Sequence, residues 1–134
     1  APLDLEHIFL QFQTMAVNMP GLGYLRATSA NAAPLYREAA TRGMLESPGL
    51  DAVPVTGRMA LLHIDGNHRY DHVLQDIALW SPYLVPGGWL LLDDYCWAFG
   101  DGPRRAGDEL LSHGGFDTAF VAAETLFLRR TIAP

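Results

Sequence analysis

The hydrophobic pattern in the first part of the chain has the spacing of helices separated by turns and loops. Between residues 4 and 19 the apolar positions recur at helical intervals, and Asp4 stands where an N-cap is expected. Residues 31–42 are rich in alanine and predict a second helix, and the short segment 23–28 before it fits a strand. The segment 43–57 holds three glycines and two prolines, so we predict a loop there.

The pattern then changes to continuous apolar runs that alternate with amphipathic helical segments. A run such as MALLHI is typical of a strand buried on both faces of a parallel sheet. The chain ends with two β-rich segments so close in sequence that only an antiparallel hairpin can join them. In chain order we predict a strand at 59–64, a helix at 70–84, a break at Pro86-Gly87-Gly88, a strand at 89–92, a helix at 103–113, and hairpin strands at 116–123 and 125–132.

These elements predict one α/β domain over residues 1–134. The alternation of strand and helix favours a three-layer arrangement with a mostly parallel sheet and a C-terminal antiparallel hairpin. A length of 134 residues suffices for one domain with a hydrophobic core and is too short for two. Because the chain begins at Ala1 without an initiator methionine, we expect it to be a piece of a longer chain.

Composition excludes several classes of function. The formal net charge of -6 argues against non-specific nucleic-acid binding, which needs clustered positive charge. No apolar run approaches the roughly 20 residues of a membrane-spanning helix. The single cysteine, Cys96, excludes an internal disulfide and multi-cysteine zinc patterns, and a reducing, cytoplasmic location fits best. We expect Cys96 to be a small buried hydrophobic residue.

The candidate chemistry lies where two predicted strands end. Asp65 follows the first apolar strand, and Asp93 and Asp94 follow the second. In an open parallel sheet, ligands bind beyond the carboxyl ends of the strands, so neighbouring strands would bring these three acids together. Carboxylates at such short distances repel one another unless a divalent cation that binds oxygen ligands lies between them. His68 lies in the loop above the same edge, within reach of a proton on a bound substrate.

Simpler explanations exist for single residues at this edge. Each acid alone is more often a helix N-cap or a solvated loop residue. His63, inside the apolar strand, is expected to be a hydrogen-bonded core or cofactor-edge histidine. Other residues have surface or packing roles as the default, although the aromatic ones also suit an acceptor pocket and the arginines an anion: His7, His72, His113, Tyr95, Trp97, Phe99, Arg104 and Arg105.

The segment HIDGNHRYDHVLQDIALWSPYLVPGGWLLLDDY resembles strands four and five, with the helix between them, of class I S-adenosylmethionine-dependent methyltransferases. It is most similar to the branch of metal-dependent O-methyltransferases that modify sugars and other natural products, with their cephalosporin hydroxylase-like relatives. The resemblance implies that Asp65, Asp93 and Asp94 bind Mg²⁺ or Mn²⁺. It implies that His68 is the general base toward a hydroxyl group of a small-molecule acceptor.

The resemblance does not extend to the parts of the family's fold that bind the methyl donor. The family's glycine-rich loop after strand one and the ribose-binding acid after strand two have no counterpart, so strands one and two are expected to be missing. Residues 23–29 resemble strand three, with Ser29 on the cofactor side, although Ser29 as a helix N-cap is the simpler alternative. Of the family's strand order 3-2-1-4-5-7-6, strand three would then close against strand four.

Three functions follow as hypotheses. The first is a metal-assisted O-methyltransferase domain that, as this piece, binds S-adenosylmethionine weakly or not at all. The second is a non-catalytic methyltransferase-like scaffold or oligomerisation module. The third is a lyase or hydrolase that uses the same acids and metal. Because a sheet without its central strands exposes an edge, we also expect a homo-oligomer.

Overall fold

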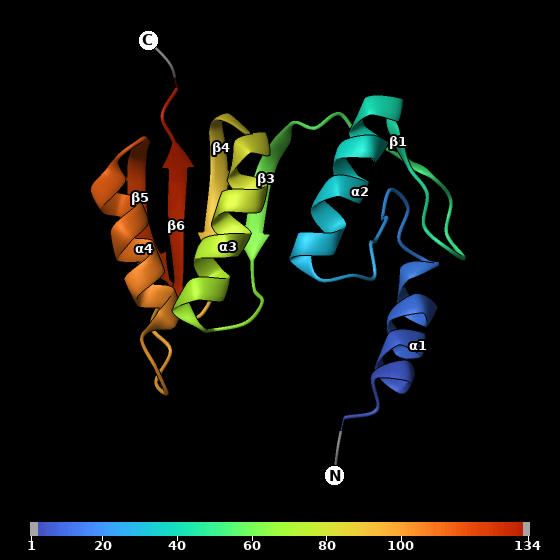
Figure 1. The fold of residues 1–134 in the computed structure, drawn as a ribbon, viewed down its shortest axis with the longest axis horizontal. Helices are drawn as coiled ribbons and strands as arrows, with labels where there is room; N and C mark the ends of the chain where they lie inside the picture. Colours follow the sequence, from blue (N-terminus) through green and yellow to red (C-terminus); the bar gives the residue numbers. More distant parts are fainter. Residues whose placement is uncertain (1–2, 133–134) are drawn as a thin grey trace. The chain divides into compact units, whose positions relative to one another are not determined.

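A computed structural model describes residues 3–132, and it divides the chain into two compact units (Figure 1). The first unit ends at Gly57 and the second begins at Arg58. Ala1, on which the expectation of a longer chain rests, lies outside the described residues.

Two helices and a short β-pair form the first unit. Helix α1 spans Leu5–Ala16, and Asp4 caps it by accepting a hydrogen bond from the His7 amide, as predicted. Helix α2 spans Ser29–Arg42. Its N-cap is Thr28, whose side chain accepts from the Asn31 amide, so the alternative role of Ser29 as the cap is wrong. Ser29 is the first residue of α2 itself.

Two predictions for the first unit are wrong. The segment 23–28 is not a strand, because a side chain takes the place of a neighbouring strand: the buried Ser47 hydroxyl accepts from the Tyr24 amide at 2.8 Å and donates to the Tyr24 carbonyl at 3.1 Å. The segment 43–57 is not wholly loop, since β1 (Met44–Leu45) and β2 (Val53–Pro54) pair antiparallel within it.

The second unit is built on a four-stranded mixed sheet. Its strand order is β3-β4-β6-β5, in which β3 and β4 are parallel and the other two pairs are antiparallel. This order confirms the 4-5-7-6 part of the expected sequence of strands, and β3 forms an edge of this sheet, while the strand expected at 23–28 is not formed. The elements are β3 (Met59–Ile64), α3 (Tyr70–Trp80), a 3-10 turn (Ser81–Tyr83), β4 (Leu84–Leu92), α4 (Gly102–His113), β5 (Phe116–Ala122) and β6 (Thr125–Arg130).

Strand β4 begins earlier than predicted. The predicted break at Pro86-Gly87-Gly88 lies inside the strand, and it coincides with a register shift against β3 between Met59 and Leu61. Gly87 has a φ of 79°, in the left-handed region that glycine adopts without a steric penalty. The irregularity therefore lets the strand continue where the sequence suggests that it stops.

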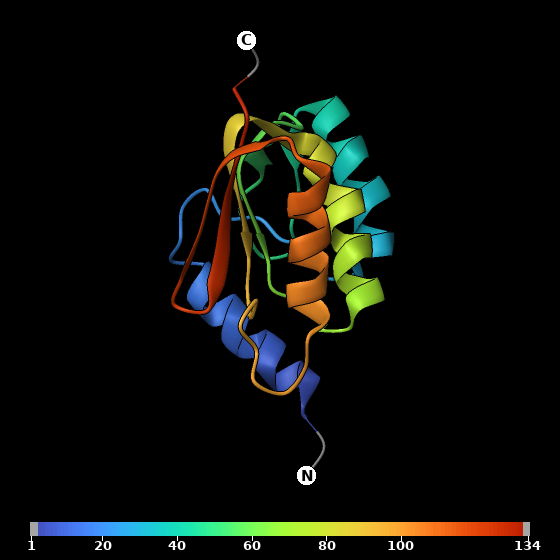
Figure 2. The same cartoon turned by 90° about the vertical axis from the view of Figure 1, so that its left-hand side faces the viewer.

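The core of the second unit lies between the sheet and two helices. Helices α3 and α4 lie side by side on one face of the sheet (Figure 2). Alternate strand residues point toward them, so Leu90 and Leu92 of β4 are 0% and 1% exposed. Leu62 and Ile64 of β3 belong to the same buried cluster. His63 of β3 and Leu91 of β4, which stand between these pairs in sequence, lie on the opposite face of the sheet.

None of the helices that the described residues form has the length and hydrophobicity needed to cross a membrane.

Candidate functional site

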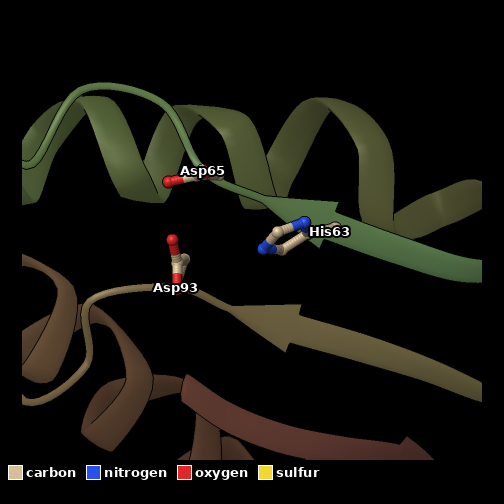
Figure 3. A group of neighbouring side chains, drawn as sticks. All are labelled: His63, Asp65 and Asp93. Carbon is tan, nitrogen blue, oxygen red and sulfur yellow. The ribbon is translucent and has the colours of Figure 1, made fainter. Parts of the chain in front are cut away.

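The parallel pairing of β3 and β4 brings the predicted acids together. The last paired residues are Ile64 and Leu92, so Asp65 and Asp93 follow directly at neighbouring strand ends. The Asp93 amide donates to the Ile64 carbonyl at 3.0 Å, which extends the pairing past the end of the ladder. Figure 3 shows the side chains of Asp65 and Asp93 pointing toward each other across the gap between these ends.

Asp65 and Asp93 share a hydrogen bond, which shifts their pKa values in opposite directions. This hydrogen bond is the largest cause that raises the pKa of Asp65, helped by partial desolvation and by the charge of Asp93. The Thr125 hydroxyl donates to Asp93 Oδ1 at 2.8 Å and is the largest cause that lowers the pKa of Asp93. Of the two carboxyl groups, Asp65 is therefore the one with the higher pKa.

His68 contacts the third acid of the site. Its Nε2 atom lies 2.8 Å from Oδ2 of Asp94, and the two side chains are 32% and 28% exposed. The Trp97 ring borders the imidazole, with 4.5 Å between ring centroids. Ligand atoms of Asp65, His68 and Asp94 all lie within 4.8 Å of one another. The structure thus brings together the four residues that the sequence singled out at this edge.

The backbone at Asp94 has a conformation that few residues other than glycine adopt. Its φ is 53°, in the left-handed region, where aspartate is among the more frequent non-glycine residues. The Trp97 amide donates to the Asp94 carbonyl at 3.0 Å and closes the turn. Strained backbone of this kind persists only where surrounding contacts hold it, and it concentrates at functional sites.

Helix α4 holds the site loops in place. The Tyr70 hydroxyl donates to Glu109, and the Tyr95 hydroxyl donates to Asp108 at 2.5 Å. These hydrogen bonds raise the pKa of both tyrosines. The guanidinium groups of the two arginines expected to be solvated stack on the same rings, Arg105 over Tyr70 at 4.2 Å and Arg104 over Tyr95 at 5.6 Å.

The start of α4 approaches His68 even more closely. At Gly102 a Cβ atom would overlap the carbonyl oxygen of His68, so only glycine leaves room for the observed contact. The carbonyl carbon of His68 and the Tyr70 amide nitrogen would each lie 3.0 Å from the added carbon. The backbone that carries His68 is therefore fixed by the first residue of α4.

Several alternatives weighed on the sequence are wrong. In the described part of the chain Asp65, Asp93 and Asp94 cap no helix, since the caps are Asp4, Thr28, Arg69, Trp80 and Asp101. Cys96 is exposed, because it follows the turn at Asp94 and lies outside the sheet. The surface positions of His7, His72 and His113 are confirmed.

Sequence reasoning missed one member of the cluster, His63. It is exposed and belongs to a second group with Asp65 and Asp93, whose ligand atoms lie within 4.8 Å of one another (Figure 3). The two-residue spacing to Asp65 was the available signal, because residues i and i+2 of a strand share a face. Ser29, by contrast, belongs to the first compact unit, whereas the acids belong to the second.

Known proteins resemble this chain in sequence and in fold. An uncharacterised protein of Acanthamoeba polyphaga mimivirus is 40% identical over 48 residues, which are 36% of this chain and 21% of that protein. MycE, a methyltransferase from the mycinamycin biosynthetic pathway whose structure contains Mg and SAH, superposes with a TM-score of 0.51 at 19% identity. The match covers 81% of this chain and 31% of MycE, so the chain spans only about a third of that protein and a fifth of the viral one.

The likeness to MycE shows a class I methyltransferase fold, in agreement with the resemblance of the strand-end motifs. The sequence model of a family described as "Methyltransferase domain" matches residues 24–95, just over half of the chain. This match includes β3, α3, β4 and all the acids at the strand ends. The chain therefore belongs to this family of methyltransferase domains.

Proposed function

We propose that this chain supplies the acceptor-activating part of a metal-assisted O-methyltransferase. The observation that carries the proposal is the convergence of Asp65, Asp93, Asp94 and His68 at the ends of two adjacent parallel strands. MycE, with a similar fold, was solved with Mg and SAH, which supports the same chemistry here.

The donor set fits a hard divalent cation. The charge of Asp93 is one cause that raises the pKa of Asp65, and a positive ion between the two carboxylates would relieve this repulsion. Asp94 offers a third carboxylate, through the oxygen that His68 does not engage. Oxygen ligands of this kind suit Mg²⁺ or Mn²⁺. Such an ion, when bound, lowers the pKa of a coordinated hydroxyl group.

His68 is the proposed general base. Asp94 holds its Nε2 atom at 2.8 Å, and a carboxylate in this position orients the imidazole and stabilises the imidazolium that forms when it takes a proton. The Trp97 ring limits the positions that the imidazole can occupy. The substrate class that suits the site is a small molecule with adjacent hydroxyl groups, such as a sugar diol or a catechol.

The residues of this chain fit the methyl donor less well than they fit the acceptor and the metal. Among residues 3–132, no strand precedes α2, so the described part lacks the strand, glycine loop and helix that cradle S-adenosylmethionine in this fold. Ser29 is the one residue that we assign to that side. We therefore route no step of the mechanism through the donor and assign to this chain the acceptor and the metal.

Two variants test the division of roles. Asp93→Asn should weaken Mn²⁺ binding to the chain, measured by electron paramagnetic resonance. In a catalytically complete version of the protein it should lower methyl transfer, and excess metal should partly restore it. His68→Ala should leave Mn²⁺ bound and lower turnover by about 10²–10⁴-fold, the usual contribution of a positioned base.

Each variant also has an outcome that contradicts the proposal. Full methyl transfer by His68→Ala would remove the base from the mechanism. Unchanged Mn²⁺ affinity in Asp93→Asn would remove the metal site, and the chain would then be the scaffold module of the second hypothesis.

A further inference from the structure

His63 occupies a position that a core histidine would not. Its neighbours in β3, Leu62 and Ile64, are 9% and 6% exposed and face α3 and α4. The alternation of a strand places His63 on the opposite face, together with Asp65 two residues later. In Figure 3 the imidazole points into the space beside the gap that separates Asp65 from Asp93.

The distances suit shared coordination of one ion. Ligand atoms of His63, Asp65 and Asp93 all lie within 4.8 Å of one another. Two ligands on opposite sides of an ion, each bound at about 2.0–2.2 Å, stand roughly 4–4.4 Å apart. The observed separations, at most 4.8 Å, are close to this span, which suits binding of one ion by all three atoms.

The register of the sheet fixes this arrangement. His63 pairs with Leu91 and Ile64 with Leu92, so the next position of β3 stands beside Asp93. Thr125, from β6, donates to Asp93 Oδ1 and holds that carboxylate from its other side. The imidazole thus comes from β3 itself, and the two carboxylates come from the positions directly after two hydrogen-bonded strands, which are rigid supports.

We propose that His63 is a nitrogen ligand of this metal site and that it makes the site prefer a first-row transition-metal ion over Mg²⁺. This inference rests on the proposed metal site and deepens it. Carboxylate oxygens bind Mg²⁺ and Mn²⁺ alike, whereas imidazole suits Mn²⁺ less than Co²⁺, Ni²⁺ and Zn²⁺ and suits Mg²⁺ least. A set of one nitrogen and two or three oxygens therefore discriminates between metals that an all-oxygen set does not.

The test is metal selectivity, measured on the chain itself by titration with Co²⁺ and with Mg²⁺ in parallel. Co²⁺ binding is followed by its visible absorption, and Mg²⁺ binding by calorimetry. His63→Gln should lower Co²⁺ affinity by about 10–100-fold and leave Mg²⁺ affinity unchanged. His72→Gln, which changes an exposed histidine on α3, is the matched control and should change neither affinity.

Pulsed electron paramagnetic resonance of bound Mn²⁺ identifies the nitrogen directly. The wild-type chain should show an imidazole nitrogen coupling that His63→Gln abolishes and His68→Gln retains. Loss of the coupling in His68→Gln alone would assign the ligand to His68 and overturn the inference. An equal loss of Co²⁺ and Mg²⁺ affinity in His63→Gln would also overturn it, because the histidine would then act through charge or structure.

Asp93→Asn separates this inference from the function on which it rests. If Asp93→Asn loses both metals while His63→Gln changes neither, the metal site stands and only the role of His63 fails. If Asp93→Asn keeps both metals, the metal site itself fails, and the role of His63 fails with it.

Discussion

Replacing Gly102 with alanine tests how tightly α4 holds the backbone of the candidate base. The added Cβ atom would overlap the His68 carbonyl oxygen and would lie 3.0 Å from the His68 carbonyl carbon and from the Tyr70 amide nitrogen. Cβ atoms in proteins essentially never come closer than 3.0 Å to a neighbour, and all three neighbours here are backbone atoms that cannot rotate away. Either the segment 68–70 or the first turn of α4 must therefore move.

Two effects of opposite sign determine the change in the free energy of unfolding. Overpacking a filled site destabilises a protein by about 1–3 kcal/mol. Alanine in place of glycine stabilises a helix interior by up to about 1 kcal/mol, and less at the first helical position, where Gly102 stands. We therefore expect a net loss of about 1–2 kcal/mol. A shift of about 1 Å in the base lowers turnover by about 10²-fold in a catalytically complete protein.

Urea unfolding measures the stability, and the imidazole resonances of His68 in nuclear magnetic resonance spectra report its displacement. Asp101→Ala is the matched control, because Asp101 is exposed and makes no capping hydrogen bond with its side chain. We expect it to change stability by less than about 0.5 kcal/mol. The reasoning is refuted if Gly102→Ala unfolds at the wild-type urea concentration and leaves the His68 resonances unshifted.

Three further predictions follow from the fold and the site. Calorimetry with S-adenosylhomocysteine should show weak or no binding to this chain, and a dissociation constant in the micromolar range would contradict the assignment of the donor cradle to residues outside it. Light scattering should give at least a dimer, because β3 is an edge strand, whereas a monomer mass at high concentration would contradict this. Mn²⁺ competes with protons for Asp65, whose pKa is raised, so Mn²⁺ affinity should rise with pH across the acid range. A titration of Mn²⁺ affinity that stays flat across the acid range would contradict the role of Asp65 as a ligand.

The sequence alone determined the strands and helices of the second unit, with errors at their ends. A continuous apolar run predicted β3 at its observed bounds, 59–64, but the expected burial on both faces is wrong, since only Leu62 and Ile64 of this strand are buried. The two β-rich segments at the end of the chain specified a hairpin, because their short connection permits nothing else. The three acids at the strand ends followed from the same reasoning, since parallel strands end at the same edge.

Contacts distant in sequence decided the segments that were predicted wrongly. At 23–28 the Ser47 hydroxyl bonds both backbone groups of Tyr24, a contact across 23 residues that no local pattern contains. In β4, β3 pairs with Leu84 before Pro86-Gly87-Gly88 and with residues 89–92 after it, so the strand continues where local propensity favours a break.

The candidate site, too, was determined partly by the sequence and partly by tertiary packing. The period of two along a strand determines from sequence that His63 and Asp65 share a face. It does not determine which face the helices cover, because the run MALLHI is apolar on both sides. Only the packing of α3 and α4 against Leu62 and Ile64 leaves His63 uncovered beside the acids, and that packing depends on the whole sheet.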